Sequence, residues 1–256
     1  MATARRPEQL AELAEKHGDR VLPLALDVTD AGAVRVAVTA GVQRFGRLDV
    51  VVNNAGYANV APIETGDEQD FRTQFETNFW GVYHVSRAVV PQLRAQGGGL
   101  IVQFSSVGGR VGGAPGIGSY QAAKFAVDGF SRVLAVETAP FGIKVMVVEP
   151  SGFATDWAGA SMTVHDIPGD YDATVGAMHR LVRANDAGPA GDPVRAAEII
   201  VAAAKRAKPP THLLLGVTAA GMALDYSRRQ IAEATAWEAV SRSADFGEPY
   251  PAAFPA

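Results

Sequence analysis

The sequence predicts an α/β fold in which one doubly wound parallel sheet carries helices on both faces. Short, continuously apolar runs alternate along the chain with longer segments whose apolar residues recur at helical spacing. Such runs are typical of parallel strands, which are buried on both sides. The 256 residues suit a single domain, 1–256, with a sizeable core, and the sequence shows neither an internal repeat nor a linker.

Five apolar runs are the expected strands. They cover residues 21–26, 49–52, 100–104, 144–148 and 213–215. Each run ends in polar or glycine-containing turn residues, which is where the loops of a parallel sheet are expected.

Six segments with helical spacing are the expected helices. They cover residues 7–17, 31–45, 67–93, 120–141, 193–207 and 219–243. Thr29 or Asp30 can cap the second helix, which Gly46 ends. The first has a short apolar face of Leu10 and Leu13. We expect residues 153–190 to be irregular or short-helical and a proline-rich tail to follow the last helix.

Composition excludes several classes of function. A net charge of −4 without long charged blocks offers no electrostatic reason to expect nucleic acid as a partner. The absence of cysteine excludes disulfides and thiolate catalysis and fits a cytoplasmic protein. No apolar stretch approaches the roughly 20 residues that span a bilayer, so we expect no membrane segment and no leader peptide. His165 and His179 lack a partner at metal-binding spacing, and we expect no metal.

The segment from Leu100 to Lys124 carries the clearest chemistry. An apolar strand ends at Ser105 and Ser106, and Tyr120 and Lys124 follow on a predicted helix. Residues four apart share one face of a helix, so the phenol and the ammonium can address the same ligand. This combination suits proton transfer to a carbonyl. The glycine-rich loop 108–118 in between is expected to be a flexible loop beside a substrate pocket rather than a phosphate cradle.

Five motifs together resemble the short-chain dehydrogenase/reductase family. They are Asn53-Asn54-Ala55-Gly56, Asn78, Ser106, Tyr120-x-x-x-Lys124 and Pro150-Ser151-Gly152-x-x-Thr155. They occur in the family's order and close to its usual spacings, and the motifs cover residues 1 to about 160. Within the family the chain is most similar to NADP-dependent hydroxysteroid and retinol dehydrogenases. The resemblance implies a Rossmann-like fold.

The resemblance implies four catalytic residues. Tyr120 would exchange a proton with the substrate oxygen, and Lys124 would lower the phenol pKa from about 10 toward neutrality. The family pattern Ser-Val-Gly-Gly selects Ser106 rather than Ser105 to hydrogen-bond the substrate oxygen. Asn78 would hold the water chain that returns protons to solvent. Turn formation for the Asn-Asn-Ala-Gly motif and strand-end capping for the serines are the simpler structural interpretations.

The resemblance also implies a cofactor site. Its residues are Arg5, Asp27, Val28, Asn53, Ala55, Gly56, Tyr120, Lys124, Pro150, Gly152 and Thr155. Arg5 matches the residue that pairs with the 2′-phosphate of NADP, and no acidic residue stands there to favour NAD. We therefore expect NADP, although Arg5 and Arg6 could simply begin a solvated helix.

One family feature has no counterpart in this sequence. The family opens with a strand and a Thr-Gly-x-x-x-Gly-x-Gly turn that binds the pyrophosphate, and nothing of that kind precedes Arg5. The plan is therefore truncated at the N-terminus, and the missing strand would leave two neighbouring strand edges unpaired. Three explanations are open: a natural protein that starts upstream, edges that pair directly after a shift, or another chain that covers them.

The function expected from these features is alcohol–carbonyl interconversion with a small-molecule substrate. Trp157, Met162, Tyr171 and Met178 lie in the segment 153–190, which forms the substrate lid in the family, and they suit an apolar alcohol or ketone. Family habit suggests a homo-dimer or tetramer. A non-catalytic remnant that acts as a binding or assembly partner is the alternative, and a sugar-nucleotide epimerase is a weaker third possibility.

Overall fold

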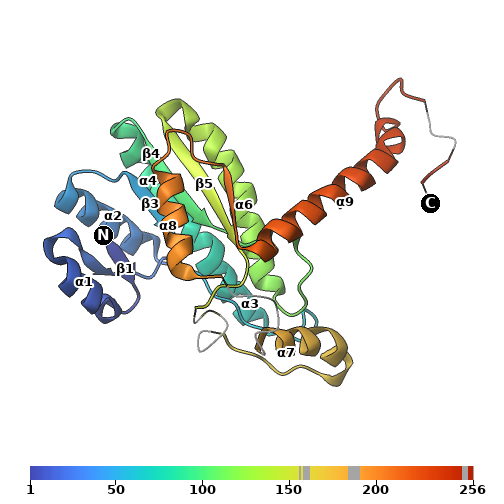
Figure 1. Cartoon of the computed structure of the whole chain (residues 1–256), viewed down its shortest axis with the longest axis horizontal. Coiled ribbons are helices and arrows are strands. Elements are labelled where there is room, and N and C mark those ends of the chain that lie inside the picture. The colour runs from blue at the N-terminus through green and yellow to red at the C-terminus, as the bar shows by residue number, and fades with distance from the viewer. Residues whose placement is uncertain (156, 158–161, 184–190, 250–252, 256) are drawn as a thin grey trace.

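The strands of the structure are all parallel and lie in two sheets. The computed structural model describes residues 1–155, 157, 162–183, 191–249 and 253–255. The strands are β1 (Ala2–Ala4), β2 (Pro23–Ala25), β3 (Val50–Asn53), β4 (Gly99–Phe104), β5 (Ile143–Pro150) and β6 (His212–Leu215). β1 pairs with β2, and the order of the larger sheet is β3-β4-β5-β6. The predicted α/β architecture is confirmed (Figure 1).

Helices connect the strands close to the predicted bounds. The helices are α1 (Ala11–His17), α2 (Ala31–Phe45), α3 (Glu68–Phe75), α4 (Gly81–Ala95), α5 (Gly108–Val111), α6 (Gly118–Thr138), α7 (Ala177–Arg183), α8 (Pro193–Ala204) and α9 (Val217–Arg242). Asp30 caps α2, as one of the two expected caps, by accepting from the backbone N–H groups of Gly32 and Ala33. The helical region predicted over 67–93, one helix leading into a longer one, comprises two helices joined by a π-helical segment, Glu76–Trp80.

The larger sheet is covered on both faces, which explains its continuously apolar strands. On one face, Ile101 and Val145 pack against Val89 and Leu93 of α4 and Leu134 of α6. On the other face, Leu100, Val102, Met146 and Val148 pack against α8 through Ala203. Neighbouring residues of β4 thus point to opposite faces, as strand geometry requires. The two layers hold the ends of β4 and β5 rigidly in the middle of the domain.

The sheet is interrupted between β1 and β3, at the place where the missing family strand predicts two unpaired edges. Among the described residues nothing pairs with the free edge of β3, and the direct edge-to-edge pairing considered above does not occur. Val50 and Val52 of β3 are 45% and 50% exposed. Figure 1 shows β1, α1 and α2 together on one side of β3. Every other strand of the larger sheet is better covered.

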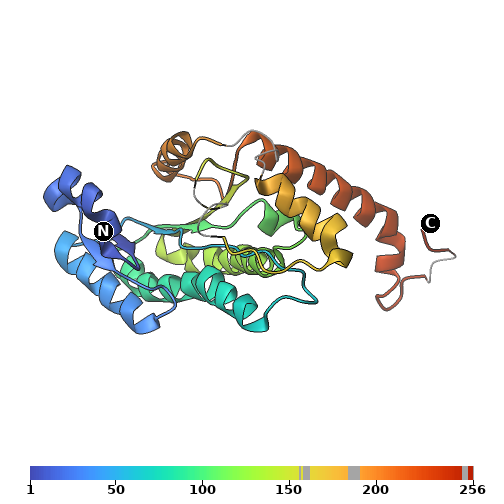
Figure 2. The same cartoon turned by 90° about the horizontal axis from the view of Figure 1, so that it is seen from below.

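The last helix stands apart from the rest of the domain. α9 projects away from the sheet in both views (Figure 1 and Figure 2). Only Ala219 and Ala223, in its first two turns, are buried. No helix in the described part of the chain is long and apolar enough to cross a membrane.

Candidate active site

The two serines at the end of β4 have different roles. One hydroxyl is used in a structural hydrogen bond, and the other is available to a ligand. Ser105 is buried, and its hydroxyl donates to the backbone carbonyl of Lys124 at 2.9 Å. Ser106 is half-buried; its Oγ accepts from the backbone N–H of Gly108 at 3.1 Å and lies 3.5 Å from the carbonyl of Pro150. The Ser105 hydroxyl therefore ties β4 to α6, and Ser106 is the serine left to face a ligand.

Tyr120 and Lys124 lie on one face of α6 and are both buried, at 8% and 3% exposure. The Lys124 ammonium donates to the carbonyl of Phe104 at 2.7 Å, and its nitrogen lies 5.5 Å from the centroid of the Tyr120 ring. Trp157 packs against the other side of the phenol, with 5.3 Å between ring centroids. The fold thus brings the phenol, the ammonium and the end of β4 together.

The ionisation of the phenol differs from the expectation. Burial raises the pKa of Tyr120 to about 12, and the nearby Ser106 hydroxyl opposes this only in part. Burial also lowers the pKa of Lys124 to about 8. The structure therefore does not show the predicted fall of the phenol pKa, because burial outweighs the hydrogen bond with Ser106. At neutral pH the phenol keeps its proton.

Asn78 sits in the π-helical segment between α3 and α4 and is fully buried. Its side-chain N–H groups donate to the carbonyls of Tyr57 and Gln74, both at 2.8 Å. Its Oδ1 has no partner within the described residues. A Cβ atom on Gly56 would lie 2.5 Å from this oxygen and 3.2 Å from the Lys124 nitrogen, so only glycine fits there. The unpaired oxygen and the ammonium therefore flank one glycine, where a polar ligand or water would be bound. π-Helical turns occur frequently at functional sites.

The residues assigned to the adenosine end gather at the ends of β1, β2 and β3. Burial, followed by the charge of Asp70, raises the pKa of Tyr57, and the positive charge of Arg5 opposes this rise. Asp27 accepts from the backbone and side chain of Thr29 at 2.9 and 2.8 Å. Val28 packs against Gly81 of α4. Val28, whose carbonyl also lies 3.1 Å from His84 Nδ1, thus links the loop after β2 to α4.

The last residue of β3 is buried, whereas the loop that follows it is exposed. The Asn53 side chain donates to Gln103 at 2.8 Å inside the core, and Gln103 donates to Ser86 at 3.0 Å. The Asn53 side chain therefore supports the sheet and only its backbone is left for a ligand. Ala55 and Gly56 are exposed.

The loop after β5 approaches the same site from the opposite side. Pro150 ends β5, and its carbonyl accepts from the backbone N–H of Val107 at 3.0 Å. Gly152 and Thr155 follow and are exposed. Part of the lid expected over 153–190 lies outside the described residues, namely 156, 158–161 and 184–190. The described part packs Met162 and Val175 around Tyr120.

Sequence reasoning missed a cluster of ionisable residues behind the catalytic face. Arg110 of α5 makes a bidentate ion pair with the fully buried Glu149 of β5. Asp128 of α6 contacts His212 of β6 at 2.7 Å and Arg132 at 2.9 Å. The one available signal was the spacing of Asp128, four residues after Lys124 on the same helical face. The loop 108–118 is consequently partly helical and anchored rather than simply flexible.

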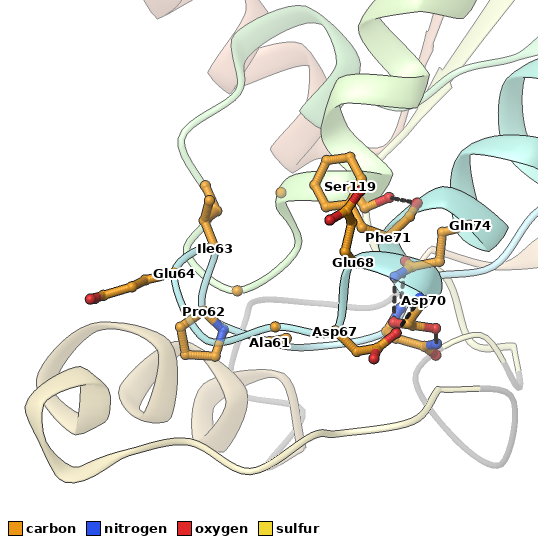
Figure 3. A pocket seen from close by; sticks show the side chains of 14 residues that line it. Ala61, Pro62, Ile63, Glu64, Asp67, Glu68, Asp70, Phe71, Gln74 and Ser119 are labelled. Carbon is orange, nitrogen blue, oxygen red and sulfur yellow. Dashed lines mark hydrogen bonds between the residues drawn. The ribbon is translucent and has the colours of Figure 1, made fainter.

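A separate pocket lies beside the start of α6 (Figure 3). It has a volume of about 320 Å³ and is formed by the loop 59–68, the start of α3 and the residues around Ser119. Its lining includes Glu64, Asp67 and Asp70, but not Ser106, Tyr120 or Lys124. This pocket is therefore distinct from the proposed reaction site.

The chain is similar to known proteins in both sequence and structure. The family model described as short chain dehydrogenase matches residues 1–164. This chain belongs to the short-chain dehydrogenase family. It is 52% identical over 217 residues to Oxidoreductase BOA17 of Botryotinia fuckeliana, covering 84% of this chain and 79% of that protein. A crystal structure of a short-chain dehydrogenase from Streptomyces avermitilis superposes with a TM-score of 0.87 at 38% identity, covering 95% of this chain and 89% of that one.

A third relative is named for its substrate. The chain is 43% identical over 136 residues to a 3-ketodihydrosphingosine reductase of Bacteroides thetaiotaomicron, covering 53% of this chain and 50% of that protein. The short-chain dehydrogenase family is one of NAD(P)-dependent oxidoreductases, and the nucleotide cofactor and a small-molecule substrate follow from membership.

Proposed function

We propose that this chain interconverts an apolar alcohol and its ketone or aldehyde with NADP, using Ser106, Tyr120, Lys124 and Asn78. The observation that carries the proposal is a buried phenol that keeps its proton, with Ser106 beside it and Lys124 on the same face of α6. A protonated phenol is the acid that carbonyl reduction requires.

The chain's own residues would act as follows. The Ser106 hydroxyl would hold the carbonyl oxygen, and the Tyr120 O–H would transfer its proton to that oxygen as the C–H bond forms. A bound nicotinamide would supply the hydride. Lys124 would stabilise the resulting phenolate, and Asn78 Oδ1 would orient the water that reprotonates it.

The described residues fit the nicotinamide end of the cofactor. The exposed loop 55–56 ends at Gly56. The backbone of Gly56 lies against the unpaired Asn78 oxygen and the Lys124 ammonium. Gly152 and Thr155 follow the end of β5 and are exposed. At the other end, Arg5 near Tyr57 would pair with a 2′-phosphate, which supports NADP over NAD.

An apolar substrate is supported by the surroundings of the phenol. Tyr120 belongs to a buried cluster with Ala58, Val60, Met162 and Val175, and Trp157 packs against it. A ketone that binds here would move its apolar surface out of water and into contact with hydrocarbon and aromatic side chains. The relative named as a 3-ketodihydrosphingosine reductase is consistent with a long apolar ketone.

A homo-dimer or tetramer is part of the proposal. Phe125, Val133 and Val136 of α6 and Trp80 beside α4 are exposed. Large exposed apolar side chains, three of them on α6 and one in the π-helical segment before α4, are typical of a protein interface. Light scattering should give at least twice the mass of the 26.8 kDa chain.

The test is a fluorescence titration of the 256-residue protein with NADPH, with NADH as the control. We expect micromolar binding of NADPH, weaker binding of NADH, and NADPH oxidation when a long-chain or polycyclic ketone is added. A folded sample that binds neither nucleotide would contradict the proposal and favour a non-catalytic binding partner.

A further inference from the structure

We propose that Arg110 is a positioning residue that acts through Glu149 to hold Ser106 against Tyr120. The inference rests on the proposed function. It starts from the buried ionic cluster of Arg110, Asp128, Glu149 and His212, to which the mechanism above assigns no role.

Arg110 fixes the loop that carries the serine. It lies four residues after Ser106, and its Nε donates to both oxygens of Glu149 at 3.1 and 3.0 Å while Nη2 donates to one of them at 2.9 Å. Glu149 is adjacent to Pro150, whose carbonyl accepts from Val107. Two consecutive residues of β5 therefore clamp both ends of the turn that follows Ser106.

The same cluster also holds the helix face that carries the other catalytic groups. Asp128 follows Tyr120 and Lys124 by two turns and one turn of α6, so the three side chains share one face. Oxygen and nitrogen atoms of Asp128, Glu149 and His212 all lie within 4.8 Å of one another. Asp128 is held by His212 from β6. The cluster near the end of β5 and the start of β6 thus positions both the Ser106 turn and the face of α6 that carries Tyr120.

Charge balance indicates arginine rather than a metal as the partner of this cluster. Two carboxylates, Asp128 and Glu149, meet two guanidinium groups, Arg110 and Arg132. A divalent cation would have to displace Arg110 from Glu149. Without Arg110, a fully buried carboxylate would face Asp128 with no counter-charge, and the two would repel each other.

The geometry of the ion pair makes the inference testable, because a lysine keeps the charge but not the planar fork. In Arg110→Lys we expect the Ser106 turn to shift, kcat to fall about tenfold, and KM and the Kd of NADPH to change less than twofold. The matched control is Arg72→Lys, because Arg72 also gives two N–H donors to one carboxylate, Glu68, but on the exposed surface of α3. It should leave kcat unchanged.

A readout that needs no turnover separates this inference from the proposed function. In protein labelled with ¹³Cζ-tyrosine, the Tyr120 resonance is assigned by its loss in Tyr120→Phe. We expect Arg110→Lys to shift it in the same direction as Ser106→Ala does, and Arg72→Lys to leave it in place. If wild-type protein bound no nucleotide but showed this pattern, the proposed function would fail while the positioning role stood.

A second variant covers the case in which Arg110→Lys does not fold. Replacing both partners by apolar residues, Arg110→Met with Glu149→Met, leaves no buried charge unpaired and is compatible with folding. The folded double variant should show the same loss of kcat and the same shift of the Tyr120 resonance. A wild-type kcat and an unmoved resonance in either folded variant would overturn the proposal.

Discussion

The two sides of this domain differ in how deeply their proposed functional residues are buried. Around β4, β5 and α6, Tyr120 and Lys124 are buried, and hydrogen bonds of 2.9 and 2.7 Å from Ser105 and Lys124 tie β4 to α6. Around β1, β2 and β3, the proposed cofactor residues are mostly exposed, and one face of β3 is half open. The difference indicates that the residues for proton transfer are already in position without a ligand. The order of the adenosine side depends more on the bound ligand. Five changes test this contrast, from the largest expected effect to the smallest.

Tyr120→Phe should have the largest effect because it removes the proton donor while keeping the buried ring. We expect turnover to fall by about a thousandfold or more, with NADPH affinity and thermal stability nearly unchanged. The control is Tyr83→Phe, which removes a phenol hydroxyl that accepts only from Arg87. Wild-type-like turnover in Tyr120→Phe would reject the mechanism.

Gly109→Ala probes how tightly the reaction side is packed. A Cβ atom there would lie 2.5 Å from Ser105 Oγ and 2.7 Å from the Lys124 Cβ. We expect a loss of about 1–3 kcal/mol in the free energy of unfolding, measured by urea titration. Gly129→Ala on the same side of the molecule meets nothing within 4 Å and should stabilise α6 by about 0.5–1 kcal/mol. Equal effects of the two changes would argue against tight packing.

Val102→Ala and Val52→Ala compare the two sides directly, since these valines are register partners on β4 and β3. Val102 is fully buried and Val52 is half exposed. Removing the buried methyl groups should cost about 2 kcal/mol, and removing the exposed ones less than about 1 kcal/mol. A cost at Val52 as large as that at Val102 would show that the open face of β3 is covered in solution.

Arg5→Ala tests the cofactor side. Loss of a charge-assisted contact to the 2′-phosphate should weaken NADPH binding about tenfold and leave NADH binding unchanged. The neighbouring Arg6→Ala is the control. If NADPH and NADH weakened equally, the assignment of Arg5 to the phosphate would be wrong.

Asp128→Asn should give the smallest effect, and its sign depends on pH. Burial tends to raise the pKa of Asp128, but the hydrogen bonds from His212 and Arg132 outweigh it and hold this pKa below its usual range. Wild-type protein therefore gains stability from this carboxylate above the unfolded pKa of about 3.9 and loses it as the pH falls further. The difference in melting temperature between wild type and variant should narrow as the pH falls from 6 toward 3. A constant difference would mean that the charge of Asp128 does not contribute.

The sequence by itself determined the order and type of the main elements. Alternating apolar runs and helical periodicity predicted the parallel strands β2 to β6 and the helices between them, because burial on two faces requires such runs. The spacing of Tyr120 and Lys124 predicted their common face on α6.

Only the tertiary structure decided the environment of these residues. The protonated state of Tyr120 follows from its burial under Trp157, which no local spacing shows. The missing family strand predicted a gap between β1 and β3, but only the tertiary structure shows that the two edges do not pair with each other. The cluster of Arg110, Asp128, Glu149 and His212 joins four elements that are distant in the chain. Such long-range contacts arise from packing, so their effects on charge and position could not be predicted from neighbouring residues.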